Sequence, residues 1–294
     1  MISPMLCASG TRKLESLDGN YFLEPKLDGE RLIALCLDKR LTLLTRRGNN
    51  VTNRFPEVVK ALEGHVLRHK TFVLDGELTV LGGFTALLRR NTDDRTHIEI
   101  LSSQLPATYH VFDLLRLEGE DFKSLPLFER RSKLERFMWS QYGTVRRIKT
   151  LDGYAPEVFR KAVEEGYEGI VAKRKDSPYE ERRSRSWIKF KKSETMDAFV
   201  IGATASDAGS LFGALVLMAD GKYLGKVGSG FTRKERERIW YLLSARCTDR
   251  QYAHIPSEVR KEMTLECHPV PIEVRMQETI DGSPRHPVFV RMRA

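Results

Sequence analysis

The lysine at position 26 has the surroundings in this sequence that most suggest chemistry. It lies in "YFLEPKLDGERLIAL" (21–35), between two apolar runs that are typical of strands. One interpretation is a hairpin in which Asp28 and Gly29 make the turn and the charges face water. The other is a lysine nucleophile that forms a covalent intermediate. The stretch alone does not decide between them.

A nucleophilic lysine places demands on the rest of the chain. The amine attacks only when neutral, and its reference pKa is ~10.4. Nearby cations would disfavour the ammonium form and would also bind the phosphates of a nucleotide. A metal ion that balances a triphosphate needs carboxylates facing the site. A lysine nucleotidyltransferase therefore requires a nucleophile, basic phosphate ligands, carboxylates carried on strands, and an aromatic platform for the base.

Residues of all four kinds occur in the chain. Glu77 in "FVLDGELTV" and Glu168 in "GYEGIVAKR" are acids in apolar contexts, where an unpaired carboxylate would be costly. Phe112 in "YHVFDLL" is the aromatic candidate, although a single aromatic residue is more often part of a core. The cationic candidates are Arg46, Lys173, Lys189 and Lys191. Arg46 lies in the turn "TRRGN", and an arginine in a surface turn would otherwise be unremarkable.

The distribution of charge points to a polyanionic partner. The chain has a net charge of +9, and its pI is about 9.4. Residues 182–192, "RRSRSWIKFKK", contain six basic side chains and no acid. Strand alternation places Trp187, Lys189 and Lys191 on one face, and Ile188 and Phe190 on the other as an apolar anchor. A solvated edge strand would also carry lysines.

Length and composition are those of a soluble globular protein large enough for two domains. The 294 residues are 41% apolar and 30% charged, with no run of ~20 apolar residues that would span a bilayer. The opening "MISPMLCASGTRKLE" does not resemble a secretory signal. The cysteines at 7, 36, 247 and 267 form no CxxC pair, so the sequence predicts neither a zinc site nor a disulfide framework, but small core residues in a reducing compartment.

The first two thirds of the chain mix short strands with helices. We expect strands at 21–24, 31–37, 41–45, 71–75, 77–81 and 108–112. We expect helices at 55–68, 127–142 and 155–166, the last ending at a glycine cap. Because strands and helices do not alternate strictly, the fold class is α+β and mostly antiparallel, rather than a doubly wound parallel sheet.

The last hundred residues have a different character. Strands are expected at 197–203, 213–219 and 222–227, followed by an amphipathic helix at 232–246 and a further strand in "VPIEVRMQE". Five or so strands with a helix between the third and fourth is the layout of an OB-fold, a small β-barrel that often binds nucleic acid. With a linker near 192–196, we expect a nucleotidyltransferase (adenylation) domain at 1–193 and an OB-fold domain at 194–294.

The order of these motifs resembles that of a known family. "EPKLDGERL" is similar to the KxDGxR nucleophile motif of the ATP-dependent DNA ligases, which belong to the lysine nucleotidyltransferases with RNA ligases and mRNA capping enzymes. "TRRGN", "LDGEL", "YHVFDLL", "YEGIVAKR" and "SWIKFKK" follow in the family's order, and "SPMLC" and "RHPVFVRMR" also look ligase-like. The resemblance spans nearly the whole chain.

The resemblance implies roles at the base and sugar of the nucleotide. Lys26 would carry AMP as a phosphoramide. Glu24 would lie beside adenine and Phe112 would stack on it. Arg31 would contact the ribose or a phosphate, and Arg46 would touch the nucleotide or the nick phosphate.

It also implies roles at the phosphates. Glu77 would hold the ribose and, with Glu168, a metal ion. Lys189 and Lys191 would hold the α-phosphate, and Lys173 would belong to the nucleotide site.

Two features depart from the larger members of the family. The chain has no room for the big N-terminal DNA-binding domain of replicative ligases, so it resembles compact bacterial and archaeal end-joining and repair ligases. The family's last motif continues past its arginine with Asp-Lys, whereas Ala294 follows Arg293 here. Orientation of pyrophosphate would then rest on Arg291 or Arg293 alone.

The resemblance implies an enzyme that seals 5′-phosphate/3′-hydroxyl nicks in duplex DNA, in repair or end joining. ATP would be the co-substrate and Mg²⁺ or Mn²⁺ the metal. We expect a cytoplasmic, nucleoid-associated monomer that does not bind membranes and that could act with end-joining or repair proteins. An RNA ligase or a capping-type guanylyltransferase is the alternative enzyme, and a nucleic-acid-binding module with a decayed site is the alternative class.

Overall fold

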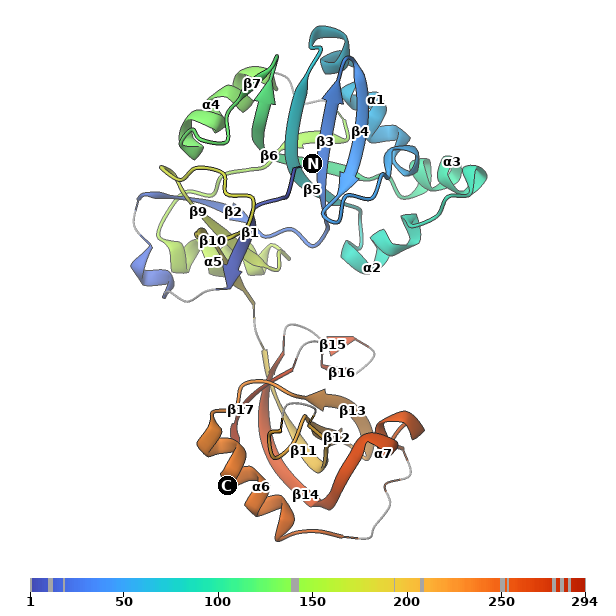
Figure 1. Cartoon of the computed structure of the whole chain (residues 1–294), viewed down its shortest axis with the longest axis vertical. Coiled ribbons are helices and arrows are strands. Elements are labelled where there is room, and N and C mark those ends of the chain that lie inside the picture. Colours follow the sequence, from blue (N-terminus) through green and yellow to red (C-terminus); the bar gives the residue numbers. More distant parts are fainter. Residues whose placement is uncertain are drawn as a thin grey trace. The chain divides into compact units, whose positions relative to one another are not determined.

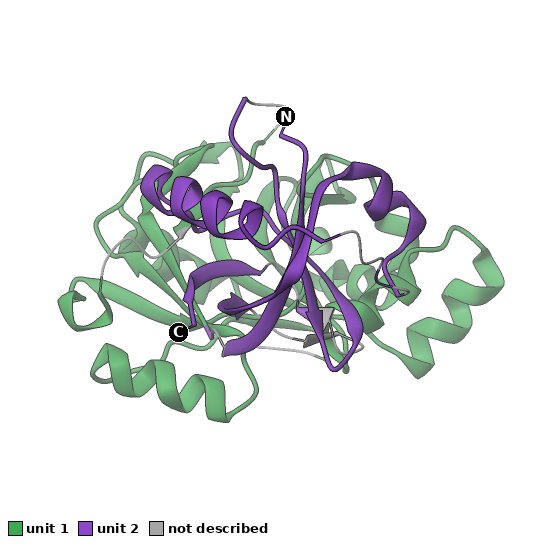
Figure 2. Cartoon of the chain, turned by 90° about the horizontal axis from the view of Figure 1, so that it is seen from below, with its two compact units in different colours: residues 1–191 green, residues 192–294 purple. Residues whose placement is uncertain are grey.

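The computed structural model describes residues 2–9, 13–17, 19–138, 143–192, 194–206, 209–248, 252, 254–276, 279–280, 283–284 and 287–293. The chain divides into two compact units, Met1–Lys191 and Lys192–Ala294, coloured separately in Figure 2. Among the described helices, none combines the length and the apolar character needed to cross a lipid bilayer.

The described residues of unit 1 contain two sheets (Figure 1). One has the order β1-β10-β9-β2, with β1 (Leu6–Ser9), β10 (Arg183–Lys191), β9 (Gly169–Arg174) and β2 (Tyr21–Pro25). The other has the order β4-β3-β5-β6-β7, with β4 (Arg40–Thr45), β3 (Glu30–Leu37), β5 (Phe72–Thr79), β6 (Thr108–Leu117) and β7 (Glu120–Asp121), and β8 (Val145–Arg147) beside β6. The strand pairs are antiparallel except β1 with β10 and β6 with β8.

Helices pack around these sheets. They are α1 (Pro56–Arg68), α2 (Gly83–Leu87), α3 (Arg95–Gln104), α4 (Leu127–Phe137) and α5 (Ala155–Glu164), with 3₁₀ turns η1 (Leu14–Ser16), η2 (Thr52–Arg54) and η3 (Leu88–Arg90). α1 begins with Pro56, whose fixed φ suits a first helical turn, and it buries Val58 and Leu62. At the end of α5, Gly166 has a φ of +89°, and its N–H donates to the Val163 carbonyl. This arrangement is the glycine cap expected there.

The sequence patterns misplaced some elements. The strands expected at 71–75 and 77–81 are one strand, β5. Gly76 does not break this strand: a Cβ there would collide with the His110 carbonyl and the Tyr109 ring, so glycine allows β6 to approach. The helix expected at 127–142 ends earlier, at Phe137 with Met138 as its C-cap, and 139–142 lie outside the described residues. The helices α2 and α3 were not predicted.

Unit 2 is built on a five-stranded antiparallel sheet of order β13-β12-β11-β14-β17. Its strands are β11 (Glu194–Thr204), β12 (Leu215–Ala219), β13 (Lys222–Val227), β14 (Met263–Met276) and β17 (Val288–Met292), and a short pair is formed by β15 (Thr279–Ile280) and β16 (Ser283–Pro284). The helices are α6 (Arg233–Ser244) and α7 (Ser257–Glu262). Thr232 and Glu235 form a capping box that fixes the start of α6, and Ile239 and Leu243 then face the core of the unit.

Candidate active site

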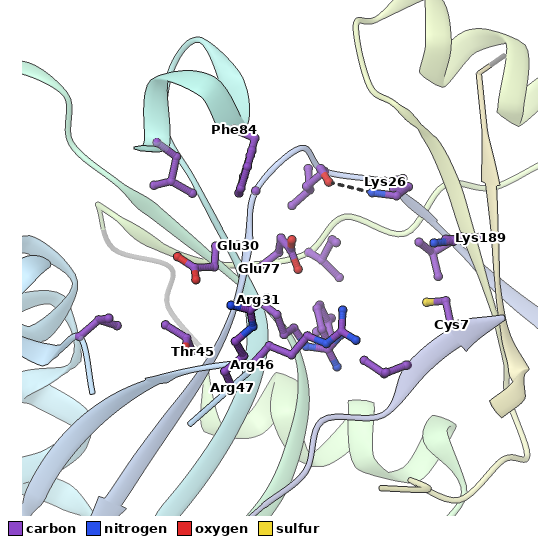
Figure 3. Close-up of a pocket in the computed structure, with 18 of the residues that line it drawn as sticks. Cys7, Lys26, Glu30, Arg31, Thr45, Arg46, Arg47, Glu77, Phe84 and Lys189 are labelled. Atoms are coloured by element: carbon purple, nitrogen blue, oxygen red, sulfur yellow. Dashed lines mark hydrogen bonds between the residues drawn. The ribbon is translucent and has the colours of Figure 1, made fainter. Parts of the chain in front are cut away.

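A cavity of about 950 Å³ opens between the two sheets of unit 1. Figure 3 shows Lys26, Lys189 and Cys7 on one side of it, and Glu30, Glu77 and the arginines nearer its middle. Eight residues predicted from the sequence line this cavity, namely Glu24, Lys26, Arg31, Arg46, Glu77, Phe112, Lys173 and Lys189. The fold therefore gathers residues from β2, β3, β5, β6, β9 and β10 that are far apart in the chain.

Lys26 follows directly after β2, and backbone hydrogen bonds hold it there. Its N–H donates to the Gly169 carbonyl at 2.9 Å, and its carbonyl accepts from the N–H of Glu168 at 3.2 Å. Gly169 has a φ of +138°, and a Cβ on it would collide with the carbonyl of Phe190 in β10. Glycine is thus required where β9 passes between its neighbours. The side chain of Lys26 starts from a position that three strands define.

The Asp28–Gly29 turn also has tertiary contacts. The Asp28 carboxylate accepts a hydrogen bond from the Phe84 N–H at 2.8 Å, at the start of α2. A Cβ on Gly29 would lie far inside van der Waals contact with the Leu78 carbonyl of β5. The interpretation of this stretch as a solvated hairpin is therefore wrong for Asp28, because its carboxylate binds protein rather than water alone.

Three charged side chains surround the Lys26 amine. Its Nζ forms an ion pair with Glu168, and Lys191 Nζ lies 3.4 Å from the same Glu168 oxygen. Burial raises the pKa of Glu168, but Lys26 and Lys191 lower it by more, so the net pKa lies below its ordinary value. Burial, Lys191 and Lys26 lower the pKa of Lys189. Lys26, Lys189 and Lys191 therefore concentrate positive charge here, as the alternation in β10 predicted.

A buried charge cluster lies deeper in the cavity wall. Glu24 is 1% exposed and forms ion pairs with Lys173 at 2.7 Å and Arg131 at 3.0 Å. Burial lowers the pKa of Lys173, and Glu24 opposes that shift. The Lys173 amine also lies 3.5 Å from the centre of the Phe112 ring. Glu24 and Lys173 thus form a buried ion pair at the cavity wall. Because an unpaired buried charge is costly, each of the two side chains needs the other.

Phe112 is 5% exposed, and cations approach its ring. Besides Lys173, the Arg31 guanidinium carbon lies 4.6 Å from the ring centre, and Trp187 packs edge-on at 5.8 Å. Trp187 is itself fully buried, so the face of β10 that carries the lysines is also anchored in the core. Stacking of a base on Phe112 requires a ring face that the cations leave open, and that role stays a prediction.

Arg31 is held by a hydrogen-bonded network. Its guanidinium donates to both carboxylate oxygens of Asp75, at 2.5 and 2.6 Å, and to the Met5 carbonyl at 3.1 Å. The Tyr179 hydroxyl donates to Asp75 at 2.6 Å and accepts from the Met5 N–H at 2.9 Å. Asp75, from "LDGEL", therefore fixes the orientation of Arg31 at the cavity wall.

Two carboxylates, Glu77 and Glu30, lie on the strands β5 and β3. Burial raises the pKa of Glu77 to about 7, although Arg31 and Lys26 oppose the shift. Burial also raises the pKa of Glu30, against Arg54 and Arg47. In the part of the chain that the structure describes, three or more His, Cys, Asp or Glu side chains do not come together as a ready metal site. Glu77 and Glu168 would have to share a metal with water and phosphate oxygens.

The outer part of the cavity is basic. Arg46 is exposed and lines it together with Arg47 and Arg54. Arg54 forms an ion pair with Asp93 at 2.9 Å. The sequence predicted only Arg46 here, whereas the structure shows three arginines along this rim.

Arg293, the remaining predicted site residue, lies in unit 2 after β17. Its guanidinium is 2.9 Å from Asp197 and 3.5 Å from Glu273, and Arg291 is 2.6 Å from Glu273. Both arginines thus have carboxylate partners within their own unit.

Sequence reasoning missed several residues of the cavity. Glu30, Arg47 and Arg54 lie in or near quoted motifs but have no distinguishing pattern. Asp75 could have been found, since an acid inside an apolar strand needs a partner. Arg131 has no sequence signal, because it reaches Glu24 only through the packing of α4.

The fold and cavity define a nucleotide-sized, lysine-rich site between two largely antiparallel sheets. Residues 4–191 match the family model described as ATP dependent DNA ligase domain. The chain is 30% identical to a DNA ligase of Thermococcus fumicolans, over 97% of this chain and 53% of the relative. The chain belongs to the ATP-dependent DNA ligase family.

Some of the relatives are bacterial. The multifunctional non-homologous end joining protein LigD of Pseudomonas aeruginosa is 36% identical over 75% of this chain and 27% of that protein. The solved ligase domain of LigD from M. tuberculosis is 28% identical with a TM-score of 0.58, covering 99% of this chain and 95% of that one. A mycobacterial DNA ligase D solved with ATP and MES is 27% identical, with a TM-score of 0.57 and the same coverage. The chain spans about half the length of the DNA ligases of Thermococcus fumicolans and Thermococcus onnurineus.

Proposed function

We propose that the chain is an ATP-dependent DNA ligase. Lys26 attacks the α-phosphate of ATP, and pyrophosphate leaves with formation of a lysyl–AMP phosphoramide. AMP then passes to the 5′-phosphate of a nick, and the adjacent 3′-hydroxyl displaces AMP and seals the strand. Membership of the family supports this reaction, and the similarity to a multifunctional non-homologous end joining protein, LigD, supports a repair or end-joining context.

The observation that carries the proposal is the position of the Lys26 amine. It lies at the wall of a nucleotide-sized cavity, fixed by the backbone of β9 and flanked by Lys189 and Lys191. The two flanking ammonium groups suit the α-phosphate and compensate the charge that develops when pyrophosphate leaves. Glu168, the ion-pair partner of Lys26, helps to hold the amine at this position.

The carboxylates fit a divalent metal. Glu77 and Glu168 offer oxygen ligands of the type that Mg²⁺ and Mn²⁺ prefer, and Mg²⁺ commonly binds through one or two carboxylates with phosphate and water. The metal would offset the triphosphate charge. Burial of Glu77 supports this role, because a buried carboxylate is stabilised by a nearby cation.

The remaining cavity residues suit the nucleoside. A mycobacterial ligase of similar sequence was solved with ATP, which supports ATP as the nucleotide here. We assign Arg31 to the ribose or a phosphate, and Glu24 with Lys173 to the adenine side. Phe112 would supply the apolar surface for the base. Arg46 on the rim would contact the nick phosphate.

We assign different functions to the two units. Unit 1 is the adenylation domain. In the five-stranded sheet of unit 2, three strands precede α6 and two follow it, and the strand order is consistent with an OB-fold that contacts duplex DNA. The net charge of +9 supports binding through phosphates with little sequence preference. We propose a cytoplasmic monomer that works at nicks, where repair or end-joining proteins could recruit it.

One experiment separates the candidate functions. The full chain is incubated with labelled ATP or GTP and then challenged with nicked DNA or nicked RNA. Label from ATP together with a sealed DNA nick supports the proposal. Label from GTP would indicate a capping-type enzyme, sealing of RNA alone an RNA ligase, and no covalent label a binding module.

A further inference from the structure

Two cysteines of unit 2 that are far apart in the sequence are neighbours in the structure. Cys247 follows α6, Cys267 lies in β14, and the two form an isolated antiparallel β-bridge. Figure 1 shows the end of α6 beside β14. Both cysteines are free thiols. The absence of a CxxC motif predicted no disulfide, but the fold brings together a pair that motif spacing does not reveal.

The backbone around this pair has the geometry that a disulfide needs. The His268 N–H donates to the Arg246 carbonyl at 2.9 Å, and the Thr248 N–H donates to the Glu266 carbonyl at 3.1 Å. These bonds flank the two cysteines, which are therefore a non-hydrogen-bonded pair, with Cα atoms about 4.5 Å apart and side chains on the same face. Disulfides join Cα atoms that are roughly 4.4 to 6.8 Å apart.

The two thiols differ in their surroundings. Cys247 is exposed, whereas Cys267 is fully buried in the core of unit 2, with its Sγ 3.8 Å from the Val200 carbonyl. Burial and the neighbouring Cys247 raise the pKa of Cys267 to about 12. Cys247 is thus the thiol that a reagent in solution reaches first, and Cys267 can react only with what Cys247 presents to it.

We propose that Cys247 and Cys267 form a reversible intramolecular disulfide when the protein meets a low-molecular-weight disulfide of the glutathione type. The Cys247 thiolate attacks one sulfur of the reagent and expels a thiolate, which gives a mixed disulfide on Cys247. The Cys267 sulfur, on losing its proton, then attacks the Cys247 sulfur and expels the second thiolate. The reagent is reduced to two thiols, which take up the two protons that the cysteines lose.

The bond would close the segment from the end of α6 to β14. This segment includes α7 and contributes Tyr252, Ile255 and Val259 to a small apolar cluster. A cross-link there restricts the unfolded chain more than the folded one. We expect the midpoint temperature of the thermal unfolding of unit 2 to rise by about 10 °C on oxidation.

The test uses the full chain in buffers with increasing ratios of oxidised to reduced glutathione. After alkylation of the remaining thiols, intact mass and non-reducing peptide mapping identify the cysteines that have reacted. The expected result is loss of two of the four thiols, a peptide link between Cys247 and Cys267, and recovery of all four with excess reductant. Four unreacted thiols, a link between any other pair, or a dimer joined through Cys247 would overturn the proposal.

Two variants test the order of the steps. Cys267→Ala should stop at the mixed disulfide on Cys247, seen as added glutathione. Cys247→Ser, which changes only an exposed position, should take up no glutathione at Cys267 and should lose the thermal shift. The proposed route would be wrong if Cys247→Ser still showed the thermal shift on oxidation. It would also be wrong if Cys267 took up glutathione in that variant.

Discussion

Lys26 forms an ion pair with Glu168 and lies close to the ammonium groups of Lys189 and Lys191. The reactivity of its amine therefore depends on these charged side chains. We expect Lys26→Ala to abolish the covalent adenylate, since no other amine has this position. Lys26→Arg should abolish it too, because a guanidinium keeps its proton, with a pKa above ~12. The measurement is retention of labelled AMP on a denaturing gel, with Lys60→Ala on the exposed side of α1 as control. A labelled band in either Lys26 variant would remove the assignment.

Glu77 should give the enzyme a pH dependence near neutrality. Its pKa in the folded protein is about 7, so the carboxylate needed for a metal or ribose forms only as pH rises through that value. Adenylation by the wild type should therefore increase between pH 6 and about 8. Glu77→Gln should be slow throughout and should lack this inflection. An unchanged pH profile in Glu77→Gln would assign the inflection to another group.

The same residue makes a prediction about stability. A carboxyl whose folded pKa lies above its unfolded value contributes stability at low pH that is lost as pH rises through the folded pKa. Glu77→Gln should therefore become more stable relative to wild type as pH rises from 4.5 to above 7, by about 2 kcal/mol. Denaturant unfolding at several pH values measures this difference, with Glu63→Gln on α1 as an exposed control. A gap that stays constant with pH would contradict the assigned pKa.

At the scale of elements, the position of the site depends on close backbone approaches. Gly29→Ala places a methyl group against the Leu78 carbonyl, which cannot move without shifting β5. We expect a loss of about 3 kcal/mol of stability and of most adenylation activity. Gly64→Ala is the matched control, because a Cβ on this α1 glycine meets nothing within 4 Å. It should stabilise the helix by about 1 kcal/mol. Equal behaviour of the two variants in denaturant unfolding and labelling would show that the approach at Gly29 does not matter.

These contacts explain how far the sequence could predict the structure. Local patterns identified β2, β3, β4 and the helices α1, α5 and α6, because apolar periodicity and caps are short-range signals. The division of β5 at Gly76 was wrong because the reason for that glycine lies in β6. The helix α2 is only five residues long, and α3 buries a single residue, Ile98, so neither has a long apolar pattern. In the site, the sequence motifs identified residues that the fold brings together. By contrast, Arg131 reaches Glu24 and Tyr179 reaches Asp75 only through tertiary packing, which no motif reveals.

At the scale of the whole molecule, positive charge should dominate DNA affinity. If binding is mostly phosphate contact, the logarithm of the nick-binding constant should fall by about 0.9 per neutralised phosphate for each tenfold rise in salt. Arg185→Gln, at an exposed position of β10, should reduce that slope by about one contact. Fluorescence anisotropy on a nicked duplex at several salt concentrations measures both. A flat response would show that the basic surface is not the DNA footprint.

Within unit 2, the proposed chemistry assigns Arg293 a role in the first step only. Formation of lysyl–AMP expels pyrophosphate, and a cation in line with Lys26 would stabilise that leaving group. We expect Arg293→Ala to slow this step by a few kcal/mol, on the order of a hundredfold, and to affect sealing of a pre-adenylated nick far less. Single-turnover assays started from ATP and from pre-adenylated DNA separate the two steps.

The ion pairs of Arg293 supply the control for this prediction. The guanidinium contacts Asp197 and Glu273, so Arg293→Ala could also act by loosening β17 from its neighbours. Asp197→Ala removes one contact but keeps the arginine. If Arg293 acts on pyrophosphate, Asp197→Ala should leave lysyl–AMP formation intact or make it faster, because the guanidinium then has only its weaker contact with Glu273. If both variants slow the two steps equally, Arg293 has a structural role. Another residue must then supply the cation for pyrophosphate, and Arg291, which pairs with Glu273, is the first candidate to test.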